Sequence, residues 1–363
     1  MAIIIPQHPD ELTPTWFDTV WRERFGRRAA TVQAVYRTVL SDQVGAMCEG
    51  VRCVLDYRDP RGEAPASVFV KVTGTNSVNR QVARFFHLYA REVWFYQHTS
   101  LWSSVALPAV YTAAHDPADE AVVVVLEDLA GHRRRDPVAG LDRADVAALV
   151  APLAGIHAAG WQRREYPFVA LCAFGLASAD TSIARYEAAW TIMALHLAAM
   201  LPPELAEYVH VWAACWTPAR QQALHDRLGR IPRTLIHGDL HPDDLLFLPD
   251  QQRWVIVDWQ TCGAGPAVLD LAYLLGATLG DTAHDTALLR TYYDHLSPAI
   301  ARRYTYDQLL ADYPWALTST LRYVIMVGAQ VDLRNDGLKR MSQALLTRLV
   351  AANHRWHTHQ LWT

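Results

Sequence analysis

The pattern of hydrophobic positions divides the chain into a strand-rich first part and a helix-rich remainder. Apolar residues at helical spacing predict a helix over residues 11–25. The same spacing predicts one long helix over 81–98, and an apolar β-branched run predicts a buried strand at 122–126. Three further runs rich in β-branched residues predict strands of an antiparallel sheet, at 32–40, 51–57 and 67–73.

Beyond about residue 140 the apolar spacing is helical almost throughout. Helices are predicted at 144–160, 180–200, 204–230, 267–279, 285–294, 314–332 and 338–357. Extended pieces are expected only at Leu235–Ile236 and Trp254–Asp258, which bracket a loop. Because the chain is also longer than one simple core usually supports, we predict an α+β protein with two lobes. The small antiparallel β N-lobe is expected at 1–128, and the large, mostly helical C-lobe at 129–363.

Composition narrows the class of protein. Hydrophobic residues make up 51% of the chain and charged residues 19%, which is ordinary for a folded domain. The net charge of −4 gives no general attraction to nucleic acid or to an anionic membrane. No apolar run is long enough to span a membrane, and the short one at Met1–Pro6 lacks the basic flank of a signal peptide. We therefore expect a cytoplasmic protein without a nucleic-acid or membrane partner.

The cysteines do not indicate a disulfide framework or a zinc knuckle. There are five, an odd number, and no two have the C-x-x-C spacing. This absence agrees with a protein that works in a reducing compartment.

Acidic residues and histidines are concentrated in the segment His237–Asp244 and recur at Asp258, between and after two short apolar runs. Gly238 and Pro242 exclude a regular helix across this segment, so irregular backbone presents the carboxylates. Phosphoryl transfer needs a carboxylate that accepts the proton of an attacking hydroxyl, together with oxygen ligands for magnesium ions. The segment therefore predicts a site for phosphoryl transfer.

The same segment offers a second interpretation. His237 and His241 are four residues apart, as in zinc-binding H-E-x-x-H motifs. That motif requires a helix to place both imidazoles on one face, and Gly238 and Pro242 argue against a helix. We expect His237 instead to hold the loop through hydrogen bonds to its backbone.

These residues resemble the catalytic loop of the aminoglycoside phosphotransferase and choline kinase group, and more loosely its ecdysteroid-kinase-like branch, all of which share the protein-kinase-like fold. The loop of that group reads H-G-D-x-x-x-x-N, and here His237-Gly238-Asp239 is followed by Asp244 in the asparagine position. The resemblance implies that Asp239 is the catalytic base and that Asp258 and Asp244 bind Mg²⁺. An aspartate at position 244 adds a negative charge near the phosphates that a cation has to offset.

The resemblance extends over most of the chain. Lys71, one of only two lysines, resembles the lysine that holds the α- and β-phosphates, and Glu92 resembles its ion-pair partner. The resemblance also implies that the backbone at Glu127 and Leu129 binds the nucleotide base. Gly45 is expected to contact the phosphates, although its surroundings lack a G-x-G-x-x-G pattern.

Together these features predict a small-molecule kinase that transfers the γ-phosphoryl group of ATP or GTP to a hydroxyl of a metabolite or antibiotic, with Mg²⁺ as cofactor. Asp244 and the glycine-poor loop keep open a non-catalytic nucleotide-binding pseudokinase or scaffold. A protein kinase fits less well, because no A-P-E element follows Asp258 and only a short interval separates it from Asp270. The resemblance gives Asp270 the role of bracing the catalytic loop.

Several properties stay open. Acidic residues in the expected acceptor region show no pattern, which argues against a polycationic aminoglycoside as the acceptor. The sequence does not identify the acceptor, the choice between ATP and GTP, or the oligomeric state.

Overall fold

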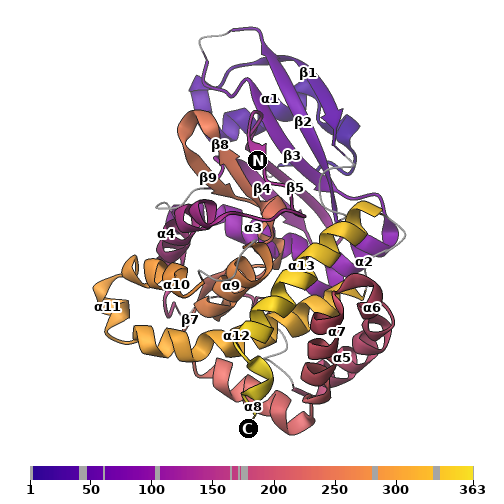
Figure 1. The fold of residues 1–363 in the computed structure, drawn as a ribbon. Coiled ribbons are helices and arrows are strands. Elements are labelled where there is room, and N and C mark those ends of the chain that lie inside the picture. Colours follow the sequence, from indigo (N-terminus) through magenta and orange to yellow (C-terminus); the bar gives the residue numbers. More distant parts are fainter. Residues whose placement is uncertain are drawn as a thin grey trace.

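The structure is a computed structural model that describes residues 3–40, 47–59, 62–102, 107–163, 166–170, 172, 179–279, 285–329 and 336–362. Its first part is a five-stranded antiparallel sheet in the order β1-β2-β3-β5-β4 (Figure 1). The strands are β1 (Val32–Val39), β2 (Cys48–Tyr57), β3 (Ser67–Thr73), β4 (Val110–Asp116) and β5 (Ala121–Glu127). The four predicted strands are present. Strand β4 was not predicted, because every one of its residues is only partly buried and its sequence lacks an apolar alternation.

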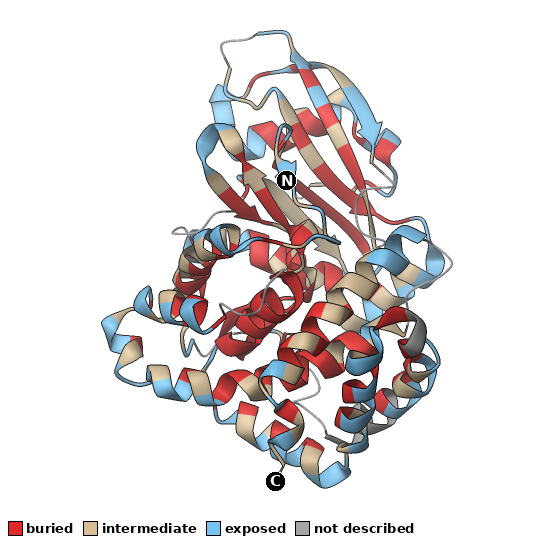
Figure 2. Ribbon diagram, in the orientation of Figure 1, coloured by how far each residue is buried: buried red, intermediate tan, exposed pale blue. Residues whose placement is uncertain are grey.

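Both faces of the sheet are covered, which explains the unbroken run of valines in β5. Val123 and Val125 pack on one face with helix α1 (Pro14–Phe25). Val122 and Val124 belong to the large core on the other face, which includes residues of helix α3 (Leu88–Gln97). Figure 2 shows the buried colour running through the middle of the sheet. Packing on both faces therefore fixes the position of β3, which lies next to β5 in the sheet.

The single helix predicted at 81–98 is wrong: the structure has two helices, α2 (Ser77–Phe86) and α3. They are separated at His87, whose φ of 56° is in the left-handed region that ends helices. The apolar spacing continues across the break, so the pattern of side chains could not reveal it. The change of direction at His87 sets the course of α3 between the sheet and the helical part of the molecule.

The remainder of the chain is mostly helical, as predicted. The helices are α4 (Arg143–Gly160), α5 (Ala179–Ala194), α6 (Leu197–Met200), α7 (Pro203–Ala214), α8 (Pro218–Gly229), α9 (Ala267–Tyr273), α10 (Asp285–Asp294), α11 (Pro298–Ala301), α12 (Tyr306–Gly328) and α13 (Asp336–Arg355). The helix predicted at 204–230 is interrupted, because Thr217 caps a new helix that begins with Pro218. Helix α12 starts earlier than predicted, at a capping box of Thr305 and Gln308.

Short strands frame the predicted catalytic loop. Strand β7 (Arg233–Ile236) pairs with β10 (Gly263–Pro266), and a second small sheet has the order β6-β8-β9, with β6 (Arg133–Arg134), β8 (Leu245–Leu248) and β9 (Arg253–Ile256). The expectation of only two extended pieces here was wrong. These strands have two to four residues, and β10 contains two glycines and a proline, so they carry little β-propensity.

The fold confirms the predicted α+β architecture of an antiparallel β lobe and a mostly helical lobe. The division at residues 128 and 129 stays a prediction. Within the described ranges, no helix has the length and apolar character needed to cross a membrane.

Candidate active site

The loop after β7 is held in place by hydrogen bonds to the buried carboxylate of Asp270. Oδ2 of Asp270 accepts a hydrogen bond from the backbone N–H of His237, and Oδ1 accepts one from Gly238, both at 2.8 Å. Nε2 of His157 lies 3.2 Å from Oδ2 of Asp270. Gly238 has a φ of 88°, which a residue with a side chain rarely adopts. Asp239 therefore leaves a turn whose course is fixed by Asp270.

His237 has a structural environment. Burial lowers the pKa of its imidazole, which favours the neutral form. Nε2 hydrogen-bonds the carbonyl of Val257 at 2.9 Å, and Nδ1 accepts the N–H of Asp239 at 3.3 Å. Both ring nitrogens are thus engaged with backbone. Among the described residues, no group of three or more His, Cys, Asp or Glu side chains is placed to hold a metal.

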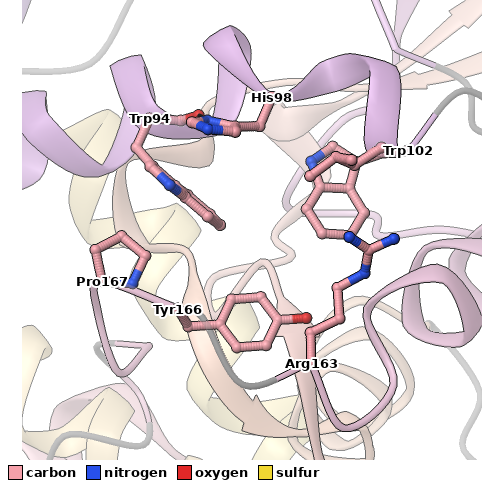
Figure 3. Close-up of a pocket in the computed structure, with 7 residues that line it drawn as sticks. Trp94, His98, Trp102, Arg163, Tyr166 and Pro167 are labelled. Carbon is pink, nitrogen blue, oxygen red and sulfur yellow. Dashed lines mark hydrogen bonds between the residues drawn. The ribbon is translucent and has the colours of Figure 1, made fainter.

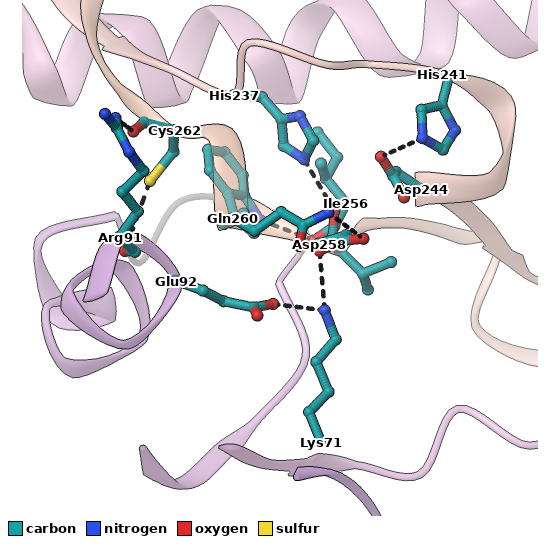
Figure 4. A network of polar contacts seen from close by, with 12 residues as sticks. Lys71, Arg91, Glu92, His237, His241, Asp244, Ile256, Asp258, Gln260 and Cys262 are labelled. Carbon is teal, nitrogen blue, oxygen red and sulfur yellow. Dashed lines mark hydrogen bonds and ion pairs between the residues drawn. The ribbon is translucent and has the colours of Figure 1, made fainter. Parts of the chain in front are cut away.

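The structure brings three residues predicted for the site together at the junction of the sheet with the helical lobe. Nζ of Lys71 lies 2.7 Å from Oε1 of Glu92 on α3 and 2.9 Å from Oδ1 of Asp258 (Figure 4). Lys71 and Glu92 are buried, and the side chain of Asp258 is 18% exposed. Asp258 itself has a φ of 62°, a backbone strain that aims its carboxylate at Lys71.

The charges in this group decide its protonation. Burial lowers the pKa of Lys71, but the charges of Asp258 and Glu92 outweigh burial and hold that pKa well above its usual value. Burial likewise raises the pKa of Asp258, and Lys71 outweighs it, so the carboxylate stays ionised. For Glu92 burial prevails and raises the pKa to about 7. Lys71 therefore stays a cation between the carboxyl groups of Glu92 and Asp258.

Asp244 adds a further carboxylate to this group. It is buried, and its Oδ2 lies 3.2 Å from Nε2 of His241 (Figure 4). Burial raises the pKa of Asp244 well above its usual range, and the charges of Asp258 and Asp239 raise it further. A site of this kind is short of positive charge, because among its described residues a single lysine, Lys71, faces several acids.

This shortage of positive charge fits Mg²⁺. The donors are carboxylate oxygens, and proteins usually bind Mg²⁺ through one or two carboxylates, with phosphate oxygens and water completing its shell. Asp244 and Asp258 are the two carboxylates that the arrangement offers. A divalent cation would offset the mutual repulsion that raises the pKa of Asp244.

Asp239, the predicted base, is partly exposed at the end of the braced turn. Two buried tyrosines, Tyr273 and Tyr323, lie near the carboxylate of Asp239. Burial raises the pKa of each tyrosine, and the negative charge of Asp239 raises it further. The two rings are 6.5 Å apart. Sequence reasoning assigned neither tyrosine to the site, although Tyr273 is only three residues beyond Asp270.

Helix α3 is fastened to the catalytic region by contacts that the sequence did not reveal. Arg91 donates hydrogen bonds to the carbonyls of Phe86, Val169 and Cys262, at 2.9, 2.6 and 2.9 Å. The ring of Phe95 stacks on Trp259, the residue after Asp258, with centroids 3.8 Å apart and an interplanar angle of 7°. These contacts fix the helix that carries Glu92 relative to Asp258. The one available signal was the position of Arg91 directly before Glu92.

The predicted base-binding hinge follows β5. Leu129 is buried in a small core with Leu246, Leu248 and Val255. Residues of β8 and β9 therefore pack against the hinge. Glu127 accepts a hydrogen bond from the N–H of Ala109 at 3.0 Å. An ion pair of 2.7 Å between Arg52 on β2 and the neighbouring Asp128, also unforeseen, ties the hinge to the sheet. Gly45 lies outside the described residues.

Several solved structures are similar to the chain. An aminoglycoside phosphotransferase from Alicyclobacillus acidocaldarius is 15% identical, with 99% of this chain and 98% of that chain covered and a TM-score of 0.46. The choline kinase of Streptococcus pneumoniae is 16% identical, with 93% and 99% covered and a TM-score of 0.45. A choline/ethanolamine kinase family protein from Mesorhizobium loti is 17% identical, with 89% and 93% covered and a TM-score of 0.44. A comparison with curated proteins gave no match.

A comparison with protein families gives a direct assignment. The model of the phosphotransferase enzyme family (APH) matches residues 61–309, which is more than half of the chain. The match includes Lys71, Glu92, Asp239, Asp244 and Asp258. It confirms the predicted resemblance and the predicted class of enzyme, a phosphotransferase. The chain therefore belongs to the phosphotransferase enzyme family.

Proposed function

We propose that this protein is a small-molecule kinase that transfers the γ-phosphoryl group of ATP or GTP to a hydroxyl group of its acceptor. The observation that carries the proposal is the position of Nζ of Lys71 between Glu92 and Asp258, in a chain of this family. A cation held between a buried glutamate and a partly exposed aspartate, next to further carboxylates, is the arrangement that a nucleotide triphosphate and its metal require. We also propose that the boundary between the two lobes lies between residues 128 and 129.

In the proposed mechanism the base of the nucleotide lies against the backbone at Glu127 and Leu129. Lys71, oriented by Glu92, holds the α- and β-phosphates, and Asp239 accepts the proton of the acceptor hydroxyl. When bound with the nucleotide, Mg²⁺ on Asp258 and Asp244 would neutralise charge on the phosphate oxygens. Most of the rate enhancement would come from positioning, because Asp270 and Arg91 already hold the loop and α3 in place.

A second candidate function is nucleotide binding without catalysis. The feature that favours it is Asp244, because burial and its acidic neighbours raise the pKa of this carboxyl and so disfavour the charged form that a metal ligand needs. This candidate predicts nucleotide binding that does not depend on magnesium. It also predicts that no acceptor is phosphorylated.

Thermal unfolding distinguishes the two candidates before any acceptor is known. A ligand present at about 100 times its dissociation constant adds about 2.7 kcal/mol, which raises the midpoint of a chain of this size by a few degrees. We expect such a rise with ATP or GTP only when Mg²⁺ is present. A rise that is indifferent to Mg²⁺ would favour the non-catalytic candidate.

An acceptor screen with labelled nucleotide then tests catalysis. Asp239→Asn should lower transfer at least about 100-fold, because general bases contribute about 10²- to 10⁴-fold. Asp250→Asn is the control, since Asp250 is exposed and follows β8, away from the proposed base. Asp239→Asn should keep the nucleotide-dependent rise in the unfolding midpoint. Full activity in that variant would disprove the assignment of the base.

A further inference from the structure

One cavity of the structure lies behind α3, away from the face that carries Glu92. It has a volume of about 590 Å³ and is lined by Trp94, His98, Trp102, Arg163, Tyr166 and Pro167 (Figure 3). Successive residues of a helix are about 100° apart, so Trp94 and His98 leave α3 on the side roughly opposite Glu92. The size is in the range of about 300–1,000 Å³ that is usual for small-molecule sites.

The walls are aromatic and the charge is positive. Trp94 and Tyr166 meet edge to face with centroids 6.1 Å apart, and the guanidinium of Arg163 lies 5.6 Å from the centre of the Trp102 ring. None of the described lining residues is acidic. Flat apolar walls suit a planar ring, and a guanidinium suits an anionic group on that ring.

Polar groups at the cavity are available to a ligand. Arg163 uses Nε to donate to the carbonyl of Ala159 at 2.7 Å, and within the described residues its two terminal nitrogens have no hydrogen-bond partner. Trp102 is 1% exposed, and in the described part of the chain its indole N–H has no hydrogen-bond partner. The indole nitrogen has almost no accessible surface, so Trp102 supplies a ring to the wall and no donor to a ligand.

We propose that this cavity binds a planar aromatic anion, such as an aromatic carboxylate, and that the ligand tightens nucleotide binding through α3. The wall formed by Tyr166 and Pro167 continues directly into Phe168 and Val169. The guanidinium of Arg91 on α3 lies 4.8 Å from the centre of the Phe168 ring and donates to the carbonyl of Val169. A ligand that bridges Trp94 to this wall would hold α3 where Glu92 meets Lys71.

The segment also reaches the catalytic region on its other side. The N–H of Ala170 donates to the carbonyl of Ala264 in β10 at 3.0 Å, and the N–H of Ala264 donates to the carbonyl of Phe168 at 2.8 Å. Strand β10 begins five residues after Asp258. The cavity wall is therefore connected by direct contacts both to the helix of Glu92 and to the strand that follows the metal-binding aspartate.

Calorimetric titration of the full chain with 2-naphthoate tests the binding. The neutral amide of the same ring, 2-naphthamide, is the control for charge. We expect Arg163→Gln to weaken 2-naphthoate binding at least about tenfold, because a charge-assisted hydrogen bond contributes about 1.5–3 kcal/mol. Arg303→Gln, a change at an exposed arginine of the helical lobe, should leave it unchanged. Absence of binding, or equal binding by the Arg163→Gln variant, would overturn the site.

Two further measurements locate the site and test the coupling. Trp94→Leu should also weaken 2-naphthoate binding, because the Trp94 ring forms part of the cavity wall. Saturating 2-naphthoate should increase the affinity for a fluorescent ATP analogue by about fivefold or more, and Arg163→Gln should abolish this increase. An unchanged nucleotide affinity would overturn the coupling. Because the first titration contains no nucleotide, its result is independent of whether the proposed kinase activity is correct.

Discussion

Nζ of Lys71 lies 2.9 Å from Oδ1 of Asp258, although 187 residues separate the two in the chain. The contact joins the central strand of the sheet to the second residue after β9. Glu92 completes the group from the third direction, on α3. The ammonium group of Lys71 on the strand therefore compensates the negative charges that the helix and the catalytic segment bring to it.

This charge compensation gives the first prediction. Lys71→Met leaves the buried carboxyl group of Glu92 and the partly exposed one of Asp258 without their cation, which should lower the free energy of unfolding by about 3–5 kcal/mol. Adding Glu92→Gln removes one of those charges and should restore part of the stability. The double variant should still show no magnesium-dependent nucleotide binding, because the phosphates have lost their lysine. Urea denaturation measures the first effect, and a Lys71→Met protein as stable as the parent would contradict the burial of the ion pair.

The second prediction concerns the brace of the catalytic loop. Asp270→Asn replaces one accepting oxygen by an NH₂ group, so the backbone N–H of His237 or of Gly238 loses its acceptor. A buried donor left unpaired costs about 1–3 kcal/mol. Turnover should fall because Asp239 is no longer aimed, while the affinity for nucleotide changes little. Asp250→Asn, at an exposed position beyond β8, is the control, and an equal loss in both variants would argue against the brace.

The third prediction concerns the anchor of α3. The planar guanidinium of Arg91 serves three carbonyls from separate segments, a geometry that one ammonium group cannot reproduce. Arg91→Lys should therefore destabilise the protein by about 2–4 kcal/mol. Arg84→Lys on α2 provides the comparison, because Arg84 is exposed and its change should be within about 0.5 kcal/mol of neutral. Chemical denaturation of both variants decides the point.

Much of this arrangement could be predicted from sequence, for identifiable reasons. The strand of Lys71 has a pattern dictated by burial on both faces, and Gly238 marks a turn that requires a positive φ. Asp239, Asp244 and Asp258 stand at fixed spacings within one continuous segment. Local signals of this kind are carried by the residues themselves.

Other features depend on tertiary contacts and left no local signal. The break at His87 interrupts a helix whose apolar spacing is continuous, and an ordinary residue there adopts the left-handed conformation. Arg91 has the same sequence appearance as an exposed helical arginine, yet it is buried because carbonyls 78 and 171 residues away surround it. The pairing of Arg52 with Asp128 is equally non-local.

The last prediction concerns pH and Asp244. Burial and acidic neighbours raise the pKa of this carboxyl above its ordinary value of 3.8, so the folded protein keeps a proton that the unfolded chain releases. Stability from this group is complete below the ordinary value and is lost as the pH rises towards the folded pKa, by at most about 1.4 kcal/mol per pH unit. Glu92, with a pKa raised to about 7, acts in the same direction.

Asp244→Asn removes the contribution of Asp244 but keeps that of Glu92. Without Mg²⁺, the parent protein should therefore lose more stability than the Asn variant between about pH 5.5 and pH 8.5 in urea denaturation, and the variant should be the more stable of the two at the higher pH. Asp250→Asn, at an exposed position, should behave like the parent. Parallel losses in parent and Asn variant would show that Asp244 is already ionised in the folded protein. With Mg²⁺ and nucleotide present the order at high pH should reverse, because the metal compensates an ionised Asp244 and gains less from an asparagine.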